Sequence, residues 1–166
     1  MSASALAVLG SLALLGASPE DAVQAELKAL QGSWLMVTSE QWGKKRDLPP
    51  IELWVFEGNR AKVYVNQQPS GPDRKAWTLR PERLNPWLTH HFKFDPAPTP
   101  KALEQLTQWR DQKSITGSPV LGIYKLEGDT LTICLGGYHD KGKRPSDFTV
   151  AKESDRRVYV FQRVKQ

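Results

Sequence analysis

Residues 122–135, GIYKLEGDTLTICL, carry the clearest structural signal in this sequence of 166 residues. Apolar and β-branched residues alternate with polar ones on both sides of Gly128-Asp129. Side chains of a strand point to opposite faces in turn, and a Gly-Asp pair between two such runs is typical of a tight hairpin turn. The stretch therefore predicts a β-hairpin that joins 122–127 to 130–135.

A second hairpin is predicted upstream, where Ile51–Glu57 and Arg60–Asn66 flank a tight turn at Gly58-Asn59. Further strand patterns begin at Gly32 and lie at 75–80, 88–94 and 158–164. Short strands joined by hairpin-length turns predict a sandwich or a barrel, and the many aromatic residues on them favour a small barrel. We therefore expect an all-β fold, a small antiparallel β-barrel of about eight strands.

One short helix is predicted before the first strand. The run Ser18-Pro19-Glu20-Asp21 combines an N-cap serine, a proline at the first helical position and acids in the first turn. Val23, Leu27 and Leu30 then follow at the i, i+4, i+7 spacing that places apolar side chains on one face of a helix. Gly32 is placed to end the helix. We expect a helix over 19–31 that lies across an apolar surface.

Residues 1–18 hold no charged side chain and contain the apolar run Ala5–Leu15. This run is too short to cross a bilayer, which takes about 20 residues, and it has the length of the apolar part of a secretory signal. We therefore expect residues 1–18 to be a signal peptide for export to the periplasm or the exterior, with no stable membrane span and one domain over 19–166. A buried N-terminal helix in a cytosolic protein is the alternative, which Gly10 and Gly16 disfavour.

The composition is that of a small globular domain, with six Trp, four Tyr, five Phe and one cysteine. The aromatic content argues against disorder, and a lone cysteine excludes a disulfide framework within the chain. The net charge of +5 comes from Lys and Arg within residues 141–166. Because no recognition helix, zinc finger or aromatic-basic RNA motif accompanies this charge, we expect a solvated surface and no nucleic acid partner.

Several motifs follow one another in an order typical of one family. They are Gly32-Ser33-Trp34, Phe94-Asp95-Pro96 followed by Pro100-Lys101-Ala102, the block 122–134, Arg144-Pro145 with Phe148, and a last strand ending at Arg163. Over residues 25–164 the chain resembles a planctomycete-type family of small, uncharacterised lipocalin-like domains. The resemblance implies a lipocalin-like β-barrel behind a short helix, often with an export signal, and it implies no activity. The Thr-Asp-x-x-Tyr motif of vertebrate-type lipocalins is absent, so their ligands are not carried over.

Residues 100–109 are compatible with two conformations. Leu103, Leu106 and Trp109 would share one side of a helix, and local propensity favours that helix. The family resemblance instead implies an extended segment over 100–107. We expect a strand here, against the local propensity.

No motif predicts catalysis, a cofactor or a metal. The sequence lacks the nucleophile patterns Gly-x-Ser-x-Gly and Ser-x-x-Lys and the phosphate-binding pattern Gly-x-Gly-x-x-Gly. His90 and His91 are adjacent on a predicted strand and so face opposite sides, and a site of His139 with Asp140 would lack a third ligand. Cys134 lies in a strand pattern and is expected to be buried. We therefore expect no catalytic residue, no cofactor and no metal.

Candidate ligand-binding residues follow from the alternation along the predicted strands. The positions expected to face the lumen are Met36, Thr38, Trp54, Phe56, Tyr124 and Leu126. An eight-stranded barrel has an interior that is either filled by side chains or wide enough for one small ligand. We favour a protein that binds a small, largely apolar molecule, with a filled barrel that meets protein partners as the alternative. An enzyme that uses Arg144, Tyr138 and His139 at the barrel mouth is the second alternative.

Arg144 precedes a proline and therefore lies in an extended turn, which we expect at one end of the barrel. Its guanidinium could bind a carboxylate or phosphate of a ligand, because such groups pair bidentately with arginine. The alternative, which we favour, is that it pairs with Asp147 or a backbone carbonyl and fixes its own loop.

Gly32, Trp34 and Arg163 are predicted to have structural roles. Trp34 opens the first strand and Arg163 lies on the last, so closure of a barrel brings them together. We expect the guanidinium to stack on the indole ring and to reach carbonyls at the end of the preceding helix.

Overall fold

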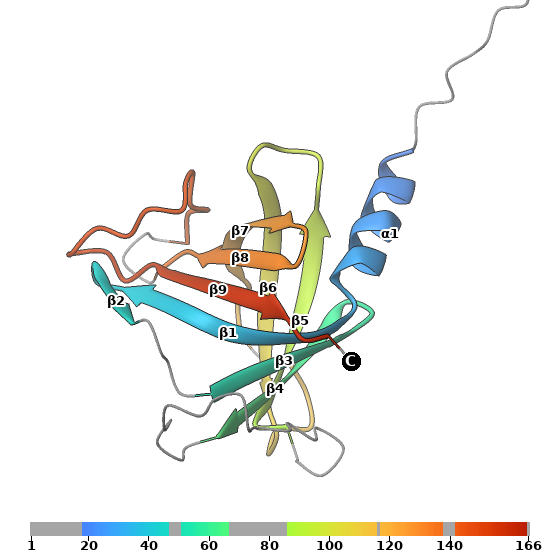
Figure 1. Ribbon diagram of the computed structural model, residues 1–166, viewed down its shortest axis with the longest axis horizontal. Helices are drawn as coiled ribbons and strands as arrows, with labels where there is room; N and C mark the ends of the chain where they lie inside the picture. Colours follow the sequence, from blue (N-terminus) through green and yellow to red (C-terminus); the bar gives the residue numbers. More distant parts are fainter. Residues whose placement is uncertain (1–17, 47–50, 67–85, 116, 138–141, 166) are drawn as a thin grey trace, which may run out of the picture.

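A computed structural model describes residues 18–46, 51–66, 86–115, 117–137 and 142–165 of the chain (Figure 1). These residues form one helix and nine strands. The elements are α1 (Pro19–Leu30), β1 (Gly32–Gln41), β2 (Lys44–Arg46), β3 (Ile51–Glu57), β4 (Arg60–Asn66), β5 (Leu88–Asp95), β6 (Lys101–Trp109), β7 (Val120–Glu127), β8 (Thr130–Leu135) and β9 (Arg157–Arg163). The predicted signal peptide, apart from Ser18, and the strand predicted at 75–80 lie outside the described residues.

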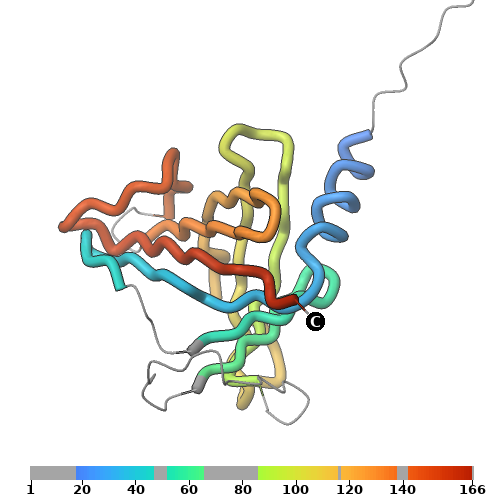
Figure 2. The backbone as a smooth tube through the Cα atoms, viewed as in Figure 1, coloured from blue at the N-terminus to red at the C-terminus, as the bar shows by residue number. Residues whose placement is uncertain are grey.

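Eight of the strands close into an antiparallel barrel. Each strand from β3 to β8 pairs with the next one along the chain, β1 pairs with β3, and β9 pairs back with β1. The short strand β2 forms a hairpin with the end of β1, beside the ring. Figure 2 shows the first and last strands of the ring running side by side. The predicted fold is confirmed: a closed antiparallel β-barrel of eight strands with one short N-terminal helix.

Both predicted hairpins are present. β3 and β4 turn at Gly58-Asn59 and β7 and β8 turn at Gly128-Asp129, where the two glycines have φ values of +62° and +59°. Glycine adopts this backbone conformation without a steric penalty, which is why these turns could be predicted from sequence. β7 begins at Val120, two residues before the predicted start, and β9 covers 157–163 where the sequence predicts 158–164.

Residues 101–109 form strand β6 and not a helix. Residues 102–109 pair with β5, and residues 101–105 also pair with β7 on the other side. These backbone pairings outweigh the local preference for a helix, because propensity is a weak effect that tertiary context readily overrides. The extended conformation implied by the family resemblance is confirmed.

Helix α1 begins as predicted and lies across the barrel end where β1 starts (Figure 1). Ser18 Oγ accepts a hydrogen bond from the Asp21 backbone N–H at 3.1 Å, and the Asp21 carboxylate accepts one from the Ser18 N–H at 3.0 Å. This reciprocal pair is a capping box. At the other end Leu30 is fully buried in the barrel core, and Gly32 follows with a φ of +104°. A glycine with positive φ just past the last turn is a common way to end a helix.

The predicted contact between Trp34 and Arg163 is present at the closure of the barrel. The two residues are partners across β1 and β9, and the guanidinium carbon lies 4.0 Å from the centre of the indole ring. Arg163 also donates to the backbone carbonyls of Gln31 at 2.7 Å and Ala29 at 2.6 Å. One side chain therefore joins the barrel closure to the end of α1, where the helix dipole favours a positive charge.

Aromatic side chains fill the half of the barrel next to α1. Phe56, Phe94, Tyr124 and Phe161 are each at most 6% exposed. These rings pack against one another and against Trp54. The ring centroids are 4.7 Å apart for Trp54 and Phe161 and 5.1 Å apart for Phe94 and Tyr124. Such offset and edge-on contacts add to the stability gained from burying the rings. This half of the lumen is core.

A second, smaller apolar cluster lies on the outer face of the barrel. It contains Ile123, Cys134 and Val158, against which Phe148 and Val150 of the loop before β9 pack. Cys134 is fully buried, as the strand pattern predicted.

The alternation of side chains is interrupted once in β1. The pairing of β1 with β9 shifts between Met36 and Thr38, so the residue between them is the extra one of a β-bulge. One extra residue reverses the inward and outward order beyond it. Thr38 is therefore opposite Val160 on the outer face, and not in the lumen where the sequence placed it, while Ser39 opposite Tyr159 faces inward.

Candidate ligand-binding site

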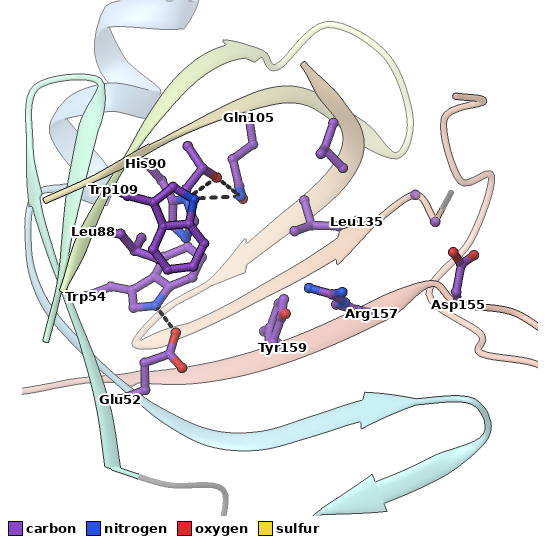
Figure 3. A pocket seen from close by; sticks show the side chains of 14 residues that line it. Glu52, Trp54, Leu88, His90, Gln105, Trp109, Leu135, Asp155, Arg157 and Tyr159 are labelled. Atoms are coloured by element: carbon purple, nitrogen blue, oxygen red, sulfur yellow. Dashed lines mark hydrogen bonds between the residues drawn. The ribbon is translucent and has the colours of Figure 1, made fainter. Parts of the chain in front are cut away.

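The end of the barrel away from α1 contains a cavity of about 420 Å³. Small-molecule sites in proteins have volumes of roughly 300–1,000 Å³. The walls are the end segments of β3, β5, β6, β8 and β9, together with Val120 at the start of β7 (Figure 3). Among the described residues, the barrel is thus packed in one half and leaves a cavity in the other.

Apolar and aromatic side chains form the floor of the cavity. Trp54 lies at the boundary between the two halves, with ring centroids 4.7 Å from Phe161 in the packed half and 4.8 Å from His90 in the cavity wall. Leu88 and Leu135 line the cavity as well. A flat or apolar part of a ligand would find a complementary surface here.

Two apolar side chains are exposed at the mouth. Trp109 is 47% exposed and Val120 is 38% exposed, and both line the cavity. The Trp109 ring meets the exposed ring of Trp87 edge-on at 6.5 Å. An exposed aromatic pair beside a cavity gives an incoming apolar group a first contact surface.

His90 belongs to a network of neutral polar groups in the wall. Its Nδ1 lies 3.0 Å from Gln105 Nε2 and 3.1 Å from Thr107 Oγ1. Burial, with a smaller contribution from the neighbouring His91, lowers the pKa of His90 to about 3. The ring is therefore neutral at physiological pH and contributes hydrogen bonds, not charge, to the site.

Gln105 carries an acceptor without a partner. The residue is 5% exposed, and its Oε1 has no hydrogen-bond partner among the described residues. Turning the amide over would exchange oxygen and nitrogen and still leave one end unpaired. A buried polar group of this kind costs roughly 1–3 kcal/mol. Because this oxygen is itself buried, a ligand would remove the cost only by pairing with an amide turned toward the cavity.

Glu52 places a carboxyl group in the cavity wall. Trp54 Nε1 donates a hydrogen bond to Glu52 Oε1 at 2.6 Å (Figure 3). Burial raises the pKa of Glu52, and this hydrogen bond opposes part of the increase. Within the described part of the chain, no Lys, Arg or His forms an ion pair with the carboxyl group.

Three further polar residues surround the opening. Burial raises the pKa of the Tyr159 hydroxyl, Arg157 lowers it through its charge and a hydrogen bond, and the charge of Glu52 raises it. Arg157 itself is exposed, and Asp155 beside it is half-buried. A Cβ atom on Gly137 would lie 1.7 Å from Asp155 Oδ1, so this approach requires glycine.

The sequence-predicted lumen residues fall in different parts of the barrel. Trp54 lines the cavity. Thr38 faces outward because of the bulge in β1. The other four belong to the packed half, namely Met36, Phe56, Tyr124 and Leu126.

Arg144 fixes its loop to the barrel and is not among the residues that line the described cavity. Its Nη1 donates to the backbone carbonyls of Leu103 in β6 and Gly122 in β7. Asp147, the other partner considered, accepts a hydrogen bond from the Thr149 backbone N–H at 2.8 Å. The contacts of Arg144 correspond to the favoured alternative, in which it pairs with backbone carbonyls.

The sequence analysis did not predict the polar residues of the cavity wall, among them Glu52, His90, Gln105 and Tyr159. Each shares the inward face of its strand with core residues, as Glu52 does with Trp54 and Phe56. The signal that could have found them is a polar side chain at an inward position close to one end of a strand.

Metal ligands are not brought together in the part of the chain that the structure describes, where no three His, Cys, Asp or Glu side chains could hold an ion. His90 faces the lumen, whereas His91 lies on the other face of β5, 3.2 Å from Gln108 Oε1. Tyr138, His139 and Asp140 are outside the described residues. The same described ranges contain no helix that is both long and apolar enough to cross a membrane.

Comparison of the chain with known protein families, with curated proteins and with solved structures finds no match. The fold is therefore assigned from the strand pairing, and the function has to be argued from the cavity.

Proposed function

We propose that this protein is a non-catalytic, lipocalin-like barrel that binds one small molecule in the cavity at the barrel end away from α1. The observation that carries the proposal is the unequal filling of the lumen. Aromatic side chains pack the half next to the helix, yet about 420 Å³ stays open beyond Trp54. Ligand sites of β-barrels are found preferentially in such mouths.

The polar groups of the wall support binding over a purely structural role. Gln105 and His90 are both more than nine-tenths buried, and Glu52 has a carboxyl group whose pKa is raised by burial. His90 and Gln105 pair with each other, but the Gln105 oxygen has no partner and Glu52 no counter-ion among the described residues, so a barrel kept only for its fold would favour apolar residues at these two positions. A ligand that pairs with them accounts for their presence.

The composition of the wall also refines the expected ligand. The sequence analysis favoured a largely apolar molecule, whereas the cavity combines a floor of Trp54 and leucines with acceptors on Glu52 and Gln105. The ligand that fits this wall has one apolar or aromatic part and at least one hydrogen-bond donor.

Val120→Trp is expected to block ligand binding, because it places a large ring at a mouth position that is 38% exposed. Val164→Trp is the matched control, since Val164 is also 38% exposed but follows β9 at the opposite end of the barrel. Native mass spectrometry of exported protein from its own host is expected to show a bound small molecule in wild type and in Val164→Trp. Val120→Trp is expected to be ligand-free.

Wild-type protein that carries no ligand, and that gains no thermal stability from any compound of a small-molecule library, would support the filled-barrel alternative. The same spectra test export, because removal of the proposed signal peptide 1–18 gives a mature chain that begins near residue 19.

A further inference from the structure

We propose that the ligand is an organic amine, with a protonated nitrogen beside Glu52 and an apolar or aromatic body over the cavity floor. This inference rests on the proposed function and names the chemical class of the ligand.

The first argument is the lack of a counter-ion at Glu52. Its carboxyl group is partly buried, and its one hydrogen-bond donor within the described residues is Trp54 Nε1 at 2.6 Å. A desolvated carboxylate is stabilised most by a cation held close to it. None of the described Lys, Arg or His residues supplies one, so the position suits a cation carried by the ligand.

The second argument is the charge of the whole cavity. Its described lining contains two acids, Glu52 and Asp155, and one base, Arg157. Arg157 is exposed to solvent, and its charge and hydrogen bond act on the Tyr159 hydroxyl, so the described lining has a formal charge of −1 with both acids ionised. His90 adds no positive charge, because its pKa is about 3. The cavity therefore attracts cations more than anions.

The third argument is the ring surface around Glu52. The Trp54 ring is fixed by its own hydrogen bond to the carboxylate, and its centroid lies 6.2 Å from that of Tyr159. Aromatic faces attract an ammonium group through their quadrupole and stack with an aromatic body. Tyr159 is the partly exposed ring of the two, whereas Trp54 is 1% exposed, so the ring face open to an amine beside Glu52 is that of Tyr159.

Gln105 adds a second acceptor in the wall. Its Oε1 is itself buried and has no donor among the described residues, so a ligand N–H would pair with it once the amide turns toward the cavity.

The test uses three probes of nearly equal shape that differ in charge, namely 2-phenylethylamine, 2-phenylethanol and 3-phenylpropanoate. Isothermal titration calorimetry of the wild-type mature protein at neutral pH is expected to show that the amine binds at least about tenfold more tightly than either of the others. Glu52→Gln should weaken amine binding by about tenfold or more and leave binding of the alcohol unchanged. Retained alcohol binding shows that the variant is folded.

Glu57→Gln is the matched control. Glu57 lies on the same strand, is exposed, and forms an ion pair with Lys62 at 2.8 Å near the other end of the barrel. Its replacement should leave the affinity for 2-phenylethylamine unchanged.

The inference is overturned if the alcohol or the carboxylate binds as tightly as the amine, or if Glu52→Gln binds the amine as wild type does. In those cases a ligand still occupies the cavity and the proposed function stands. If none of the probes binds and no ligand co-purifies, both proposals fail.

Discussion

Trp34→Ala is expected to lower the free energy of unfolding by about 3–5 kcal/mol, as large aromatic truncations in a core do. The Trp34 side chain has no exposed surface, and its Nε1 donates to the Leu30 carbonyl at 2.8 Å. The guanidinium of Arg163 also stacks on the Trp34 ring. Removing it therefore leaves a cavity, an unpaired carbonyl at the helix end and an arginine without its stacking partner. Urea denaturation midpoints of wild type and variant measure the loss.

The double variant with Arg163→Ala tests whether the two side chains act together. Arg163→Ala alone should cost about 1–3 kcal/mol, because it removes charged donors from the carbonyls of Ala29 and Gln31. Since the guanidinium and the indole are in contact, the double variant should lose less than the sum of the single losses. Trp42→Ala is the control, because Trp42 is 52% exposed and its loss should change stability by less than about 0.5 kcal/mol. Strict additivity of Trp34 and Arg163 would contradict this account of barrel closure.

Acidification from about pH 7 to about pH 4.5 should destabilise the protein by roughly 2–3 kcal/mol through His90 alone. The pKa of His90 is lowered from 6.5 to about 3 in the folded protein. Below pH 6.5 the unfolded chain therefore binds a proton that the folded chain does not. The contribution of His90 to the free energy of unfolding is fully present above pH 6.5. It decreases by about 1.4 kcal/mol for each pH unit below that, until the pH approaches 3.

His90→Gln and His91→Gln separate this effect from the other titrating groups. His91 is the matched control, because it is adjacent in sequence but lies on the opposite face of β5. The free energy of unfolding, measured by urea titration at several pH values, should fall more steeply with acid in wild type and His91→Gln than in His90→Gln. Equal slopes for all three proteins would show that His90 is not buried as a neutral group.

Local signals were sufficient for the parts of the fold that depend on neighbouring residues. The turns at Gly58-Asn59 and Gly128-Asp129 need a glycine with positive φ, and the capping box of α1 lies within Ser18–Asp21. Features that depend on distant partners were not predictable in the same way. The bulge before Thr38 is defined by the pairing of β1 with β9, more than a hundred residues away in the sequence. The short strand β2 has three exposed, basic residues and, among the described strands, pairs only with the end of β1, so no alternation in the sequence marks it as a strand.

The candidate site was predicted least well, for a geometric reason. Alternation along a strand shows which side chains face the lumen, but it does not show how far along the barrel axis each one lies. Phe56 and Glu52 share one face of β3, yet Phe56 is in the packed half and Glu52 lines the cavity. The position at which the packed aromatic side chains give way to the cavity depends on the register of all eight strands. Trp54 lies at this boundary and is the one predicted lumen residue that lines the cavity.

The most direct test of the account is where a bound ligand touches the barrel. Two-dimensional NMR of the ¹⁵N-labelled protein resolves the indole N–H groups of tryptophans, and assignment by single Trp→Phe variants identifies each signal. On titration with the tightest-binding of the three phenyl probes, the signals of Trp54 and Trp109 in the cavity should shift, and that of Trp34 in the packed half should stay in place. A shift of Trp34 with Trp54 and Trp109 unchanged would contradict the proposal that the ligand site lies at the barrel end away from α1.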